Sequence, residues 1–410
     1  MAVWQREKDL DITAKTILFL LSPFLAFLYS LRTIKTKSSY VVFFLFSVFF
    51  GLSFTVSNIR DEVNSGDGVS YRANFETYRY TSYYQYLDGL EGFLTFDDGQ
   101  KDYYFDTVAF YVSRITGNYH VMFMVFAIIF AFFSLKTFKF LTSEDNFNTS
   151  ISCFILAYLF MINQIFNING MRMWTAAWIG VYSIFQIFKN GNKKYFFLAL
   201  ITPFFHGSFW VYIAVITLAY FLRKREKIWI VLFIFSFFIS NISVELIRNV
   251  IDSLPPFLAN MAKSYTNEDY IEMRASAGSG FYWVSVLFSF LVRVYMNLLV
   301  YLFIKNSNLV KSNSKTKSLY MFLLVWMTFV NFTMPVPSLG GRFMVLSYPI
   351  IAYIWLVNFK GKKYKYVLYS MPFVFLFSFY TQFLYYIHVL EPYFFFSSPF
   401  YLIYKYLIIA

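Results

Sequence analysis

Residues 118–140 read NYHVMFMVFAIIFAFFSLKTFKF, and this stretch decides the class of fold. No Asp, Glu, Lys or Arg occurs in it before Lys136. About 20 apolar residues are needed to cross a hydrocarbon core of roughly 30 Å as a helix. Similar stretches recur along the chain, which is 59% hydrophobic and only 14% charged. The composition therefore predicts an all-α, polytopic integral membrane protein, because neither a soluble domain nor the alternating segments of a barrel would give it.

The apolar stretches predict a single membrane domain over residues 1–410, a helical bundle with about 11–13 transmembrane segments. We place the spans at about 14–32, 40–57, 118–140, 149–166, 172–188, 228–246, 281–304, 318–334, 343–358 and 366–387. The run 396–409 is either one more span or an interfacial helix, because its aromatic content is compatible with both.

The stretch 195–222 is basic at both ends, after Lys193-Lys194 and before Arg223-Lys224-Arg225. Both ends are therefore expected on the cytoplasmic side. This predicts a hairpin of two short helices, broken near Pro203 and turning at His206-Gly207. Counted as two segments, the hairpin lets the loops alternate between the two membrane faces, with the N-terminus outside.

The cations separate into two sets of loops. Short loops on one side carry the lysines: Lys35, Lys37, Lys136, Lys139, Lys189, Lys193, Lys194, Lys224, Lys227, Lys305, Lys311, Lys315, Lys317, Lys360, Lys362, Lys363 and Lys365. Nearly all carboxylates share the other side with most arginines: Arg60, Arg72, Arg79, Arg114, Arg172, Arg248, Arg274 and Arg342. Lysine-rich loops stay in the cytoplasm, which places the arginines outside and explains the net charge of +13 without a nucleic-acid partner. Because arginine's planar fork suits phosphate, this asymmetry points to a phosphorylated substrate.

Two outer loops are long, at about 58–117 and 247–280, and we expect them to carry short helices and function. The first is rich in tyrosine over Tyr78–Tyr86, which suits either stacking on sugar rings or the lipid headgroup region. Glycines flank Asp67 and predict a tight turn that presents its carboxylate. No metal site or cofactor is expected, because the spaced carboxylates of a calcium loop, zinc patterns and nucleotide loops are missing. The single cysteine, Cys153, excludes an intramolecular disulfide.

Four positively charged or titratable residues are candidates for a site. Arg172 and Arg342 are predicted at outward helix N-termini, where the helix dipole disfavours a cation unless an anion joins it. The alternative is that both reach toward lipid headgroups. His206, at the break of the hairpin, is either a general base or a cap of the broken helix. Arg293 lies near the middle of a span and should face a carboxylate or a substrate anion.

The residues at these positions resemble the EpsG family of polytopic bacterial membrane proteins, which belongs with the Wzy-type polymerases of exopolysaccharide, capsule and O-antigen repeat units. The resemblance covers most of the chain. It rests, in order, on Asp67-x-x-x-Tyr71, Arg172-Met173-Trp174-Thr175-Ala176, Phe205-His206-Gly207-Ser208 and Arg342. The chain departs from the family pattern at Met173, where glutamine is common.

The resemblance implies an inverting, metal-independent glycosyl transfer in the bacterial cytoplasmic membrane, at its outer face. The donor and the acceptor would both be oligosaccharides linked to polyprenyl diphosphate, with membrane lipids, a flippase and a chain-length regulator as further partners. Arg172 and Arg342, with Arg60 as a third, would hold the diphosphate. His206 would activate the acceptor hydroxyl, Asp67 and Tyr71 would position a sugar, and Arg293 is a further substrate-binding candidate.

Three other functions share parts of this pattern. A flippase or transporter of the same glycan would need charges along a path through the membrane, and only Arg293 is clearly deep in a span. A glycan ligase would use nearly identical chemistry. A membrane O-acyltransferase would place its histidine on a path open to the cytoplasm, contrary to the predicted outer position of His206.

Overall fold

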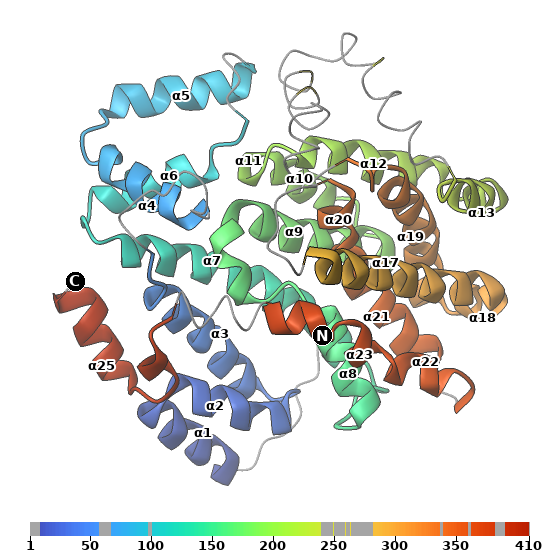
Figure 1. Ribbon diagram of the computed structural model, residues 1–410, viewed down its shortest axis with the longest axis horizontal. Helices are drawn as coiled ribbons and strands as arrows, with labels where there is room; N and C mark the ends of the chain where they lie inside the picture. The colour runs from blue at the N-terminus through green and yellow to red at the C-terminus, as the bar shows by residue number, and fades with distance from the viewer. Residues whose placement is uncertain are drawn as a thin grey trace.

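The structure is a computed structural model that describes residues 9–56, 67–96, 101–238, 282–336, 339–359, 362–381 and 390–409, with the single residues 249, 259 and 263. These ranges contain helices and no strand, which confirms the all-α fold (Figure 1). The helices of the first half are α1 (Asp9–Leu21), α2 (Pro23–Ser30), η1 (Leu31–Thr33), α3 (Lys37–Leu52), α4 (Asp67–Tyr78), α5 (Tyr83–Thr95), α6 (Tyr104–Ser113), α7 (Tyr119–Thr142), α8 (Ile151–Phe160), η2 (Ile165–Gly170), α9 (Met171–Ile184), η3 (Phe185–Lys189), α10 (Tyr195–Leu200), α11 (Thr202–Phe205), α12 (Phe209–Leu222) and α13 (Glu226–Phe235). Those of the second half are α17 (Tyr282–Lys305), α18 (Ser307–Ser312), α19 (Ser314–Phe332), α20 (Gly340–Met344), α21 (Ser347–Asn358), η5 (Lys362–Tyr364), α22 (Lys365–Tyr369), α23 (Met371–Val374), η6 (Pro392–Phe395), α25 (Pro399–Ile403) and η7 (Tyr404–Ile409).

Within the described ranges, four helical stretches are long and apolar enough to cross a membrane. They are Tyr119–Thr142, Ile151–Lys189, Val286–Lys305 and Gly340–Asn358. Shorter apolar helices lie at Lys37–Leu52, Tyr195–Phe205, Phe209–Leu222 and Pro399–Ile409. The protein is thus a polytopic membrane helical bundle, whereas the total of 11–13 crossings and the single-domain organisation stay predictions.

The single span expected at 14–32 is two helices, α1 and α2. Ser22 separates them in an extended conformation, and its hydroxyl accepts the N–H groups of Phe24 and Leu25. Pro23 then starts α2 without an N–H to continue the hydrogen bonding of α1. At about 1.5 Å per residue, neither the 13-residue nor the 8-residue helix covers a core of roughly 30 Å. The prediction of one continuous span there is therefore wrong.

The interrupted hairpin expected at 195–222 is confirmed. Helices α10 and α11 form its first arm, with Pro203 in the first turn of α11. His206 ends α11 in an extended conformation, and its backbone N–H donates to the Thr202 carbonyl at 3.1 Å. Helix α12 starts at Phe209 and forms the second arm.

The first long loop carries the short helices that were expected of it. Helices α4, α5 and α6 lie together at one end of the molecule (Figure 1). A capping box at Ser82 and Gln85 starts α5, with each side chain bonded to the other's backbone N–H. The second long loop, at 247–280, lies outside the described residues except for the single positions noted above.

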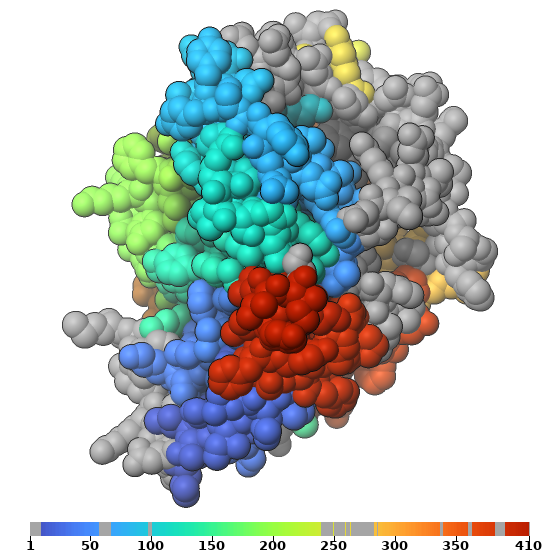
Figure 2. Space-filling model, turned by 90° about the vertical axis from the view of Figure 1, so that its left-hand side faces the viewer, coloured from blue at the N-terminus to red at the C-terminus, as the bar shows by residue number. Residues whose placement is uncertain are grey.

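The two ends of the chain pack against each other. The C-terminal segment of α25 and η7 lies beside the N-terminal helices and α7 (Figure 2). The hydroxyl of Ser22 donates to the Phe395 carbonyl at 2.8 Å, and the Asn118 amide donates to the Tyr406 carbonyl at 2.6 Å. The C-terminal run is therefore part of the bundle and contributes to its packing.

Polar groups join helices inside the largely apolar core. Asn297 of α17 and Asn331 of α19 form a reciprocal amide pair, with N···O distances of 3.1 and 2.8 Å, and both are buried. Each amide satisfies the other, so the pair fixes the rotation of one helix against its neighbour.

Glu144 collects cations from two distant segments. Its carboxylate is 2.7 Å from Lys315 Nζ and 3.6 Å from Lys189 Nζ, and it accepts the Tyr353 hydroxyl at 2.6 Å. Burial alone would raise the pKa of Glu144, but Lys315, Tyr353 and Lys189 outweigh it and hold the pKa below its ordinary value. The carboxylate is 8% exposed, so its charge interactions are only weakly screened.

We expect Glu144→Gln to lower the stability of the fold by about 2 kcal/mol at neutral pH, because charged hydrogen bonds are lost. A lowered carboxyl pKa stabilises the folded state above the unfolded pKa, and this contribution disappears as pH falls through the folded value. The difference in thermal midpoint between wild type and variant should therefore be complete well above the ordinary glutamate pKa of about 4.3 and shrink as the pH falls below it, through the lowered folded pKa.

The control for this measurement is Asp145→Asn, which changes the exposed neighbouring carboxylate. It should leave the midpoint unchanged across the same pH range. A Glu144→Gln difference that stayed constant down to acid pH would contradict the ion-pair assignment.

Candidate functional site

Five of the residues singled out in the sequence line one cavity. Its volume is about 340 Å³, and its walls include Asp67, Tyr71, Arg172, His206 and Arg342. They come from α4, the start of α9, the break before α12, and α20. Residues far apart in the sequence therefore meet at a single concave surface, with polar contributions from Asn167 and Asn169.

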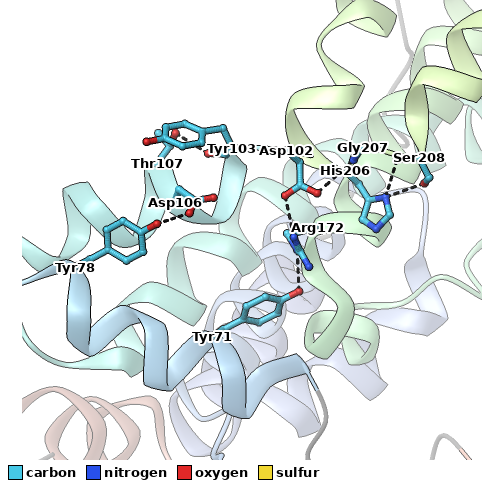
Figure 3. A network of polar contacts seen from close by, with 10 residues as sticks. All are labelled: Tyr71, Tyr78, Asp102, Tyr103, Asp106, Thr107, Arg172, His206, Gly207 and Ser208. Atoms are coloured by element: carbon cyan, nitrogen blue, oxygen red, sulfur yellow. Dashed lines mark hydrogen bonds and ion pairs between the residues drawn. The ribbon is translucent and has the colours of Figure 1, made fainter. Parts of the chain in front are cut away.

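Arg172 is the centre of the polar contacts in this region (Figure 3). It is the second residue of α9, and its Nη1 donates to Asp102 Oδ1 at 2.9 Å. Its Nε donates to the Tyr71 hydroxyl at 3.0 Å. A guanidinium has five N–H donors, so these two bonds leave three for a ligand. No side chain caps the start of α9, which follows directly on η2.

Asp102 was not singled out in the sequence, where it is one of ten acidic residues in the loop 58–117. It is 5% exposed, whereas Arg172 is 34% exposed. Its Oδ2 accepts the Gly207 N–H at 3.3 Å, so the carboxylate joins α9 to the turn that carries His206. Burial raises the pKa of Asp102, and the positive charge of Arg172 opposes this. The pair with Arg172 therefore favours the charged carboxylate at this buried position.

Tyr71 packs into the same arrangement. Its ring stacks on Phe105 with centroids 5.0 Å apart, and its side chain is 5% exposed. Burial raises the pKa of Tyr71 to about 12, so the hydroxyl stays protonated at neutral pH. The hydroxyl therefore accepts from Arg172 and keeps its own proton for another acceptor.

His206 is held through one ring nitrogen. Its Nδ1 lies 2.7 Å from the Ser208 hydroxyl oxygen and accepts a hydrogen bond from the Ser208 backbone N–H at 3.3 Å. The Ser208 hydroxyl can donate onward to Met173 Sδ at 3.9 Å. When it does, Nδ1–H donates to Ser208 Oγ and Nε2 keeps a lone pair. When Nδ1 accepts instead, Nε2 carries the proton.

Arg342 lies in the short helix α20, which leads directly into α21. The first residue of α20, Gly340, lies against the Met334 backbone, and a Cβ at position 340 would be only 2.5 Å from it. Glycine therefore allows α20 to pack close to the end of α19. The Arg342 side chain is partly buried and lines the cavity. Among the described residues it forms no ion pair with a carboxylate, in contrast to Arg172.

Asp67 is placed differently from the expectation of a tight turn. It is the first residue of α4, and Gly68 lies in the same helix. The Gly68 N–H donates to Asn169 Oδ1 at 2.7 Å, and a Cβ on Gly68 would lie 2.5 Å from that oxygen. Gly68 is needed for close approach rather than for a turn, so the predicted turn is wrong at this glycine, whereas Gly66 lies outside the described residues.

The cavity does not include all predicted residues. Arg60 lies outside the described residues. Arg293 is half-buried on α17, does not line this cavity, and has no carboxylate partner among the described residues. The roles predicted for these two arginines stay predictions.

The arginine cavity and the lysine–glutamate group lie at opposite ends of one helical segment. Arg172 begins α9, and Lys189 ends the adjoining η3. A rise of about 1.5 Å per residue separates them by roughly 25 Å, close to the thickness of a hydrocarbon core. The arginine cavity at Arg172 and the Glu144 group at Lys189 are therefore separated by roughly the thickness of a hydrocarbon core.

Gly207 holds the turn close to the segment before α6. A Cβ at position 207 would lie 2.5 Å from the Lys101 carbonyl oxygen, so Gly207→Ala should push that segment away and weaken the Asp102 contact. We expect a loss of about 1–3 kcal/mol, measured as a lower thermal midpoint.

The matched control is Gly92→Ala in the interior of α5, where a Cβ meets nothing within 4 Å. Alanine there should raise stability by about 0.5–1 kcal/mol, because glycine loses more backbone freedom on folding. Two shifts of the same sign would contradict the close packing of Gly207.

No three His, Cys, Asp or Glu side chains lie close enough to hold a metal ion in the part of the chain that the structure describes. The chain has no match among curated proteins or solved structures. The model of the EpsG family matches residues 43–400 of the 410 residues. Because this match covers most of the sequence, the chain belongs to the EpsG family, a family of Wzy-like, polysaccharide-polymerase-type membrane proteins.

Proposed function

We propose that the protein joins oligosaccharide repeat units carried on polyprenyl diphosphate, in a metal-independent glycosyl transfer that inverts the anomeric centre. The observation that carries this proposal is the meeting of two guanidinium groups and one imidazole at a cavity of about 340 Å³. This combination provides charge stabilisation for a departing diphosphate and a base for a hydroxyl nucleophile.

The reaction is a single displacement. The oxygen of an acceptor hydroxyl forms a bond to the anomeric carbon of the donor sugar, while the bond from that carbon to the diphosphate oxygen breaks. His206 takes the hydroxyl proton, and the lipid diphosphate leaves with the electron pair of the broken bond. Attack opposite the leaving group inverts the anomeric configuration.

The two arginines have different parts in this proposal. Arg342, which has no carboxylate partner among the described residues, supplies a net positive charge to the diphosphate. Arg172 is already neutralised by Asp102 and supplies directed N–H donors instead. Together they take the role in charge stabilisation that a metal ion has in other diphosphate-dependent enzymes.

The base is His206 in the form that donates Nδ1–H to Ser208 Oγ. In this form the Ser208 hydroxyl can donate onward to Met173 Sδ. The bond that Nδ1 accepts from the Ser208 backbone N–H favours the other tautomer, so His206 must exchange that bond for the one to Ser208 Oγ before it acts as a base. Nε2 keeps the lone pair that accepts a proton. Met173, the departure from the family pattern, therefore contributes through Ser208.

We further propose that the cavity opens to the outer face of the bacterial cytoplasmic membrane. The lysine group at the opposite end of the α9–η3 segment supports this orientation, since lysine-rich loops remain cytoplasmic. A flippase would deliver the substrate to this face, and a chain-length regulator would act on the product.

Arg172→Lys and Arg342→Lys should each abolish long polymer while single lipid-linked repeats persist. Lysine keeps the charge but loses the planar fork, so we expect at least a 100-fold lower rate of chain growth. The measurement is gel electrophoresis of glycan formed by purified protein from defined lipid-linked repeats. Arg32→Lys, at an exposed position in η1, is the matched control and should give a normal ladder.

His206→Asn separates a base from a helix cap. The Asn side-chain oxygen can accept the Ser208 backbone N–H in place of Nδ1, so the turn and the thermal midpoint should be retained. A proton acceptor at the Nε2 position is lost, and we expect chain growth to fall by about 10²–10⁴-fold. Normal polymer made by a well-folded His206→Asn protein would leave His206 only its structural role.

The same assay distinguishes the other functions that share this chemistry. A ladder from purified protein and lipid-linked repeats alone is expected of a polymerase. A flippase would move the substrate between leaflets of a vesicle and form no ladder. A ligase would transfer the glycan only when a different acceptor is added.

A further inference from the structure

Two more cavities continue from the arginine cavity along α4. A cavity of about 430 Å³ shares Asp67, Tyr71 and Arg172 with it. A third, of about 310 Å³, shares Asn74 and Asp106 with the second. The shared walls place the three cavities next to one another along α4, and we call the second and third together the α4 groove.

One face of α4 lines the whole length of this path. Asp67, Tyr71, Asn74 and Tyr78 follow the helical spacing i, i+4, i+7 and i+11, so they lie on one stripe. The stripe extends about 16 Å at 1.5 Å per residue. It begins at the arginine cavity and ends between α5 and α6, in the cap formed by the short helices (Figure 1).

The lining of the α4 groove is polar and aromatic. Asn74 is exposed, and the half-buried Asp106 accepts a hydrogen bond from the Tyr78 hydroxyl (Figure 3). Burial raises the pKa of Asp106, and the Tyr78 contact opposes this. Tyr103 and Tyr86, both largely buried, also line the far cavity. Neutral amides, carboxylates and tyrosine rings bind sugar hydroxyls and sugar faces, whereas an acyl chain would need an apolar lining.

The boundary between the arginine cavity and the α4 groove is built from the Tyr71–Arg172–Asp102 contacts. Arg172 lines the first and second cavities, and Asp102 lines the second. A diphosphate on the arginine side would therefore be continuous with a chain of sugar rings on the other side. The guanidinium groups of the first cavity match the charged diphosphate of such a substrate. The amides, carboxylates and tyrosines of the α4 groove match its sugar hydroxyls.

We propose that the α4 groove is the binding site for the oligosaccharide part of the lipid-linked substrate, extending away from the diphosphate over several sugar rings. This assignment, which rests on the proposed function, divides the site into an arginine half for the diphosphate and an α4 half for the glycan. The second and third cavities share two residues, Asn74 and Asp106. Asp106 is bonded to the Tyr78 hydroxyl, so we expect the Asn74 side chain to face the glycan most directly.

The test uses the repeat oligosaccharide of the producing strain, released from its lipid diphosphate by mild acid, and inorganic pyrophosphate as a second probe. Binding to the detergent-solubilised full chain is measured by isothermal titration up to millimolar concentrations. Asn74→Trp should fill the groove and raise the oligosaccharide Kd at least tenfold, and Asn74→Ala should raise it about threefold, with pyrophosphate binding unchanged. Arg342→Gln should weaken pyrophosphate binding at least tenfold and leave the oligosaccharide Kd unchanged.

Asn148→Trp and Asn148→Ala are the matched controls, because Asn148 is an exposed asparagine in a separate polar cavity beside Cys153 and Lys365. They should change neither Kd. Thermal midpoints show whether each variant folds. If Asn74→Trp does not fold, the oligosaccharide Kd of Asn74→Ala decides whether the groove binds the glycan. Failure of the wild type to bind free oligosaccharide, or equal binding by wild type and Asn74 variants, overturns the groove assignment.

The polymerase proposal is tested separately by the ladder assay. Groove-dependent oligosaccharide binding without ladder formation would retain the glycan site and remove the polymerase function. A normal ladder from Asn74→Trp, with an unchanged oligosaccharide Kd, would retain the polymerase function and remove the glycan site.

Discussion

The ion pair between Arg172 and Asp102 holds together parts of the protein that are far apart in the sequence. It joins the start of α9 to the segment before α6, and through the Gly207 N–H to the break in the 195–222 hairpin. Tyr71 attaches α4 to the same guanidinium. Loss of Arg172 would leave the buried Asp102 carboxylate without its charge partner and force it to take up a proton. The cavity therefore depends on this pair before any substrate enters it.

Charge is arranged along the bundle in two groups with opposite tasks. The Glu144 group uses two lysines to neutralise a buried carboxylate, so its cations are consumed by the fold. At the other end of the α9–η3 segment, Arg342 lines the cavity and forms no ion pair with a carboxylate among the described residues. An apolar bundle can retain an uncompensated cation only where water or a ligand anion reaches it, and the cavity provides that access.

Several elements of the site follow from local chemistry. Pro203 and the basic ends of 195–222 determine a broken hairpin, and the polar link before Arg172 determines that this residue starts a helix. Asp102 had no local signal, because nothing in its neighbours distinguishes it from nine other acids in the same loop. Its importance arises from burial beside Arg172, a contact across 70 positions in the chain. Gly68 was misread for the same reason, since the group it must approach, Asn169, belongs to a distant segment.

Sequence alone predicted an all-helical membrane protein and several of the residues that stand at breaks and helix starts, whereas the membrane side that each set of cations faces stays a prediction. These properties depend on hydropathy, charge and backbone preferences that act within a few turns. The tertiary structure was needed to show that Asp102 neutralises Arg172 and that one face of α4 lines the neighbouring cavities. Those features depend on packing between remote segments, because burial and charge pairing are set by the neighbours that the fold brings together.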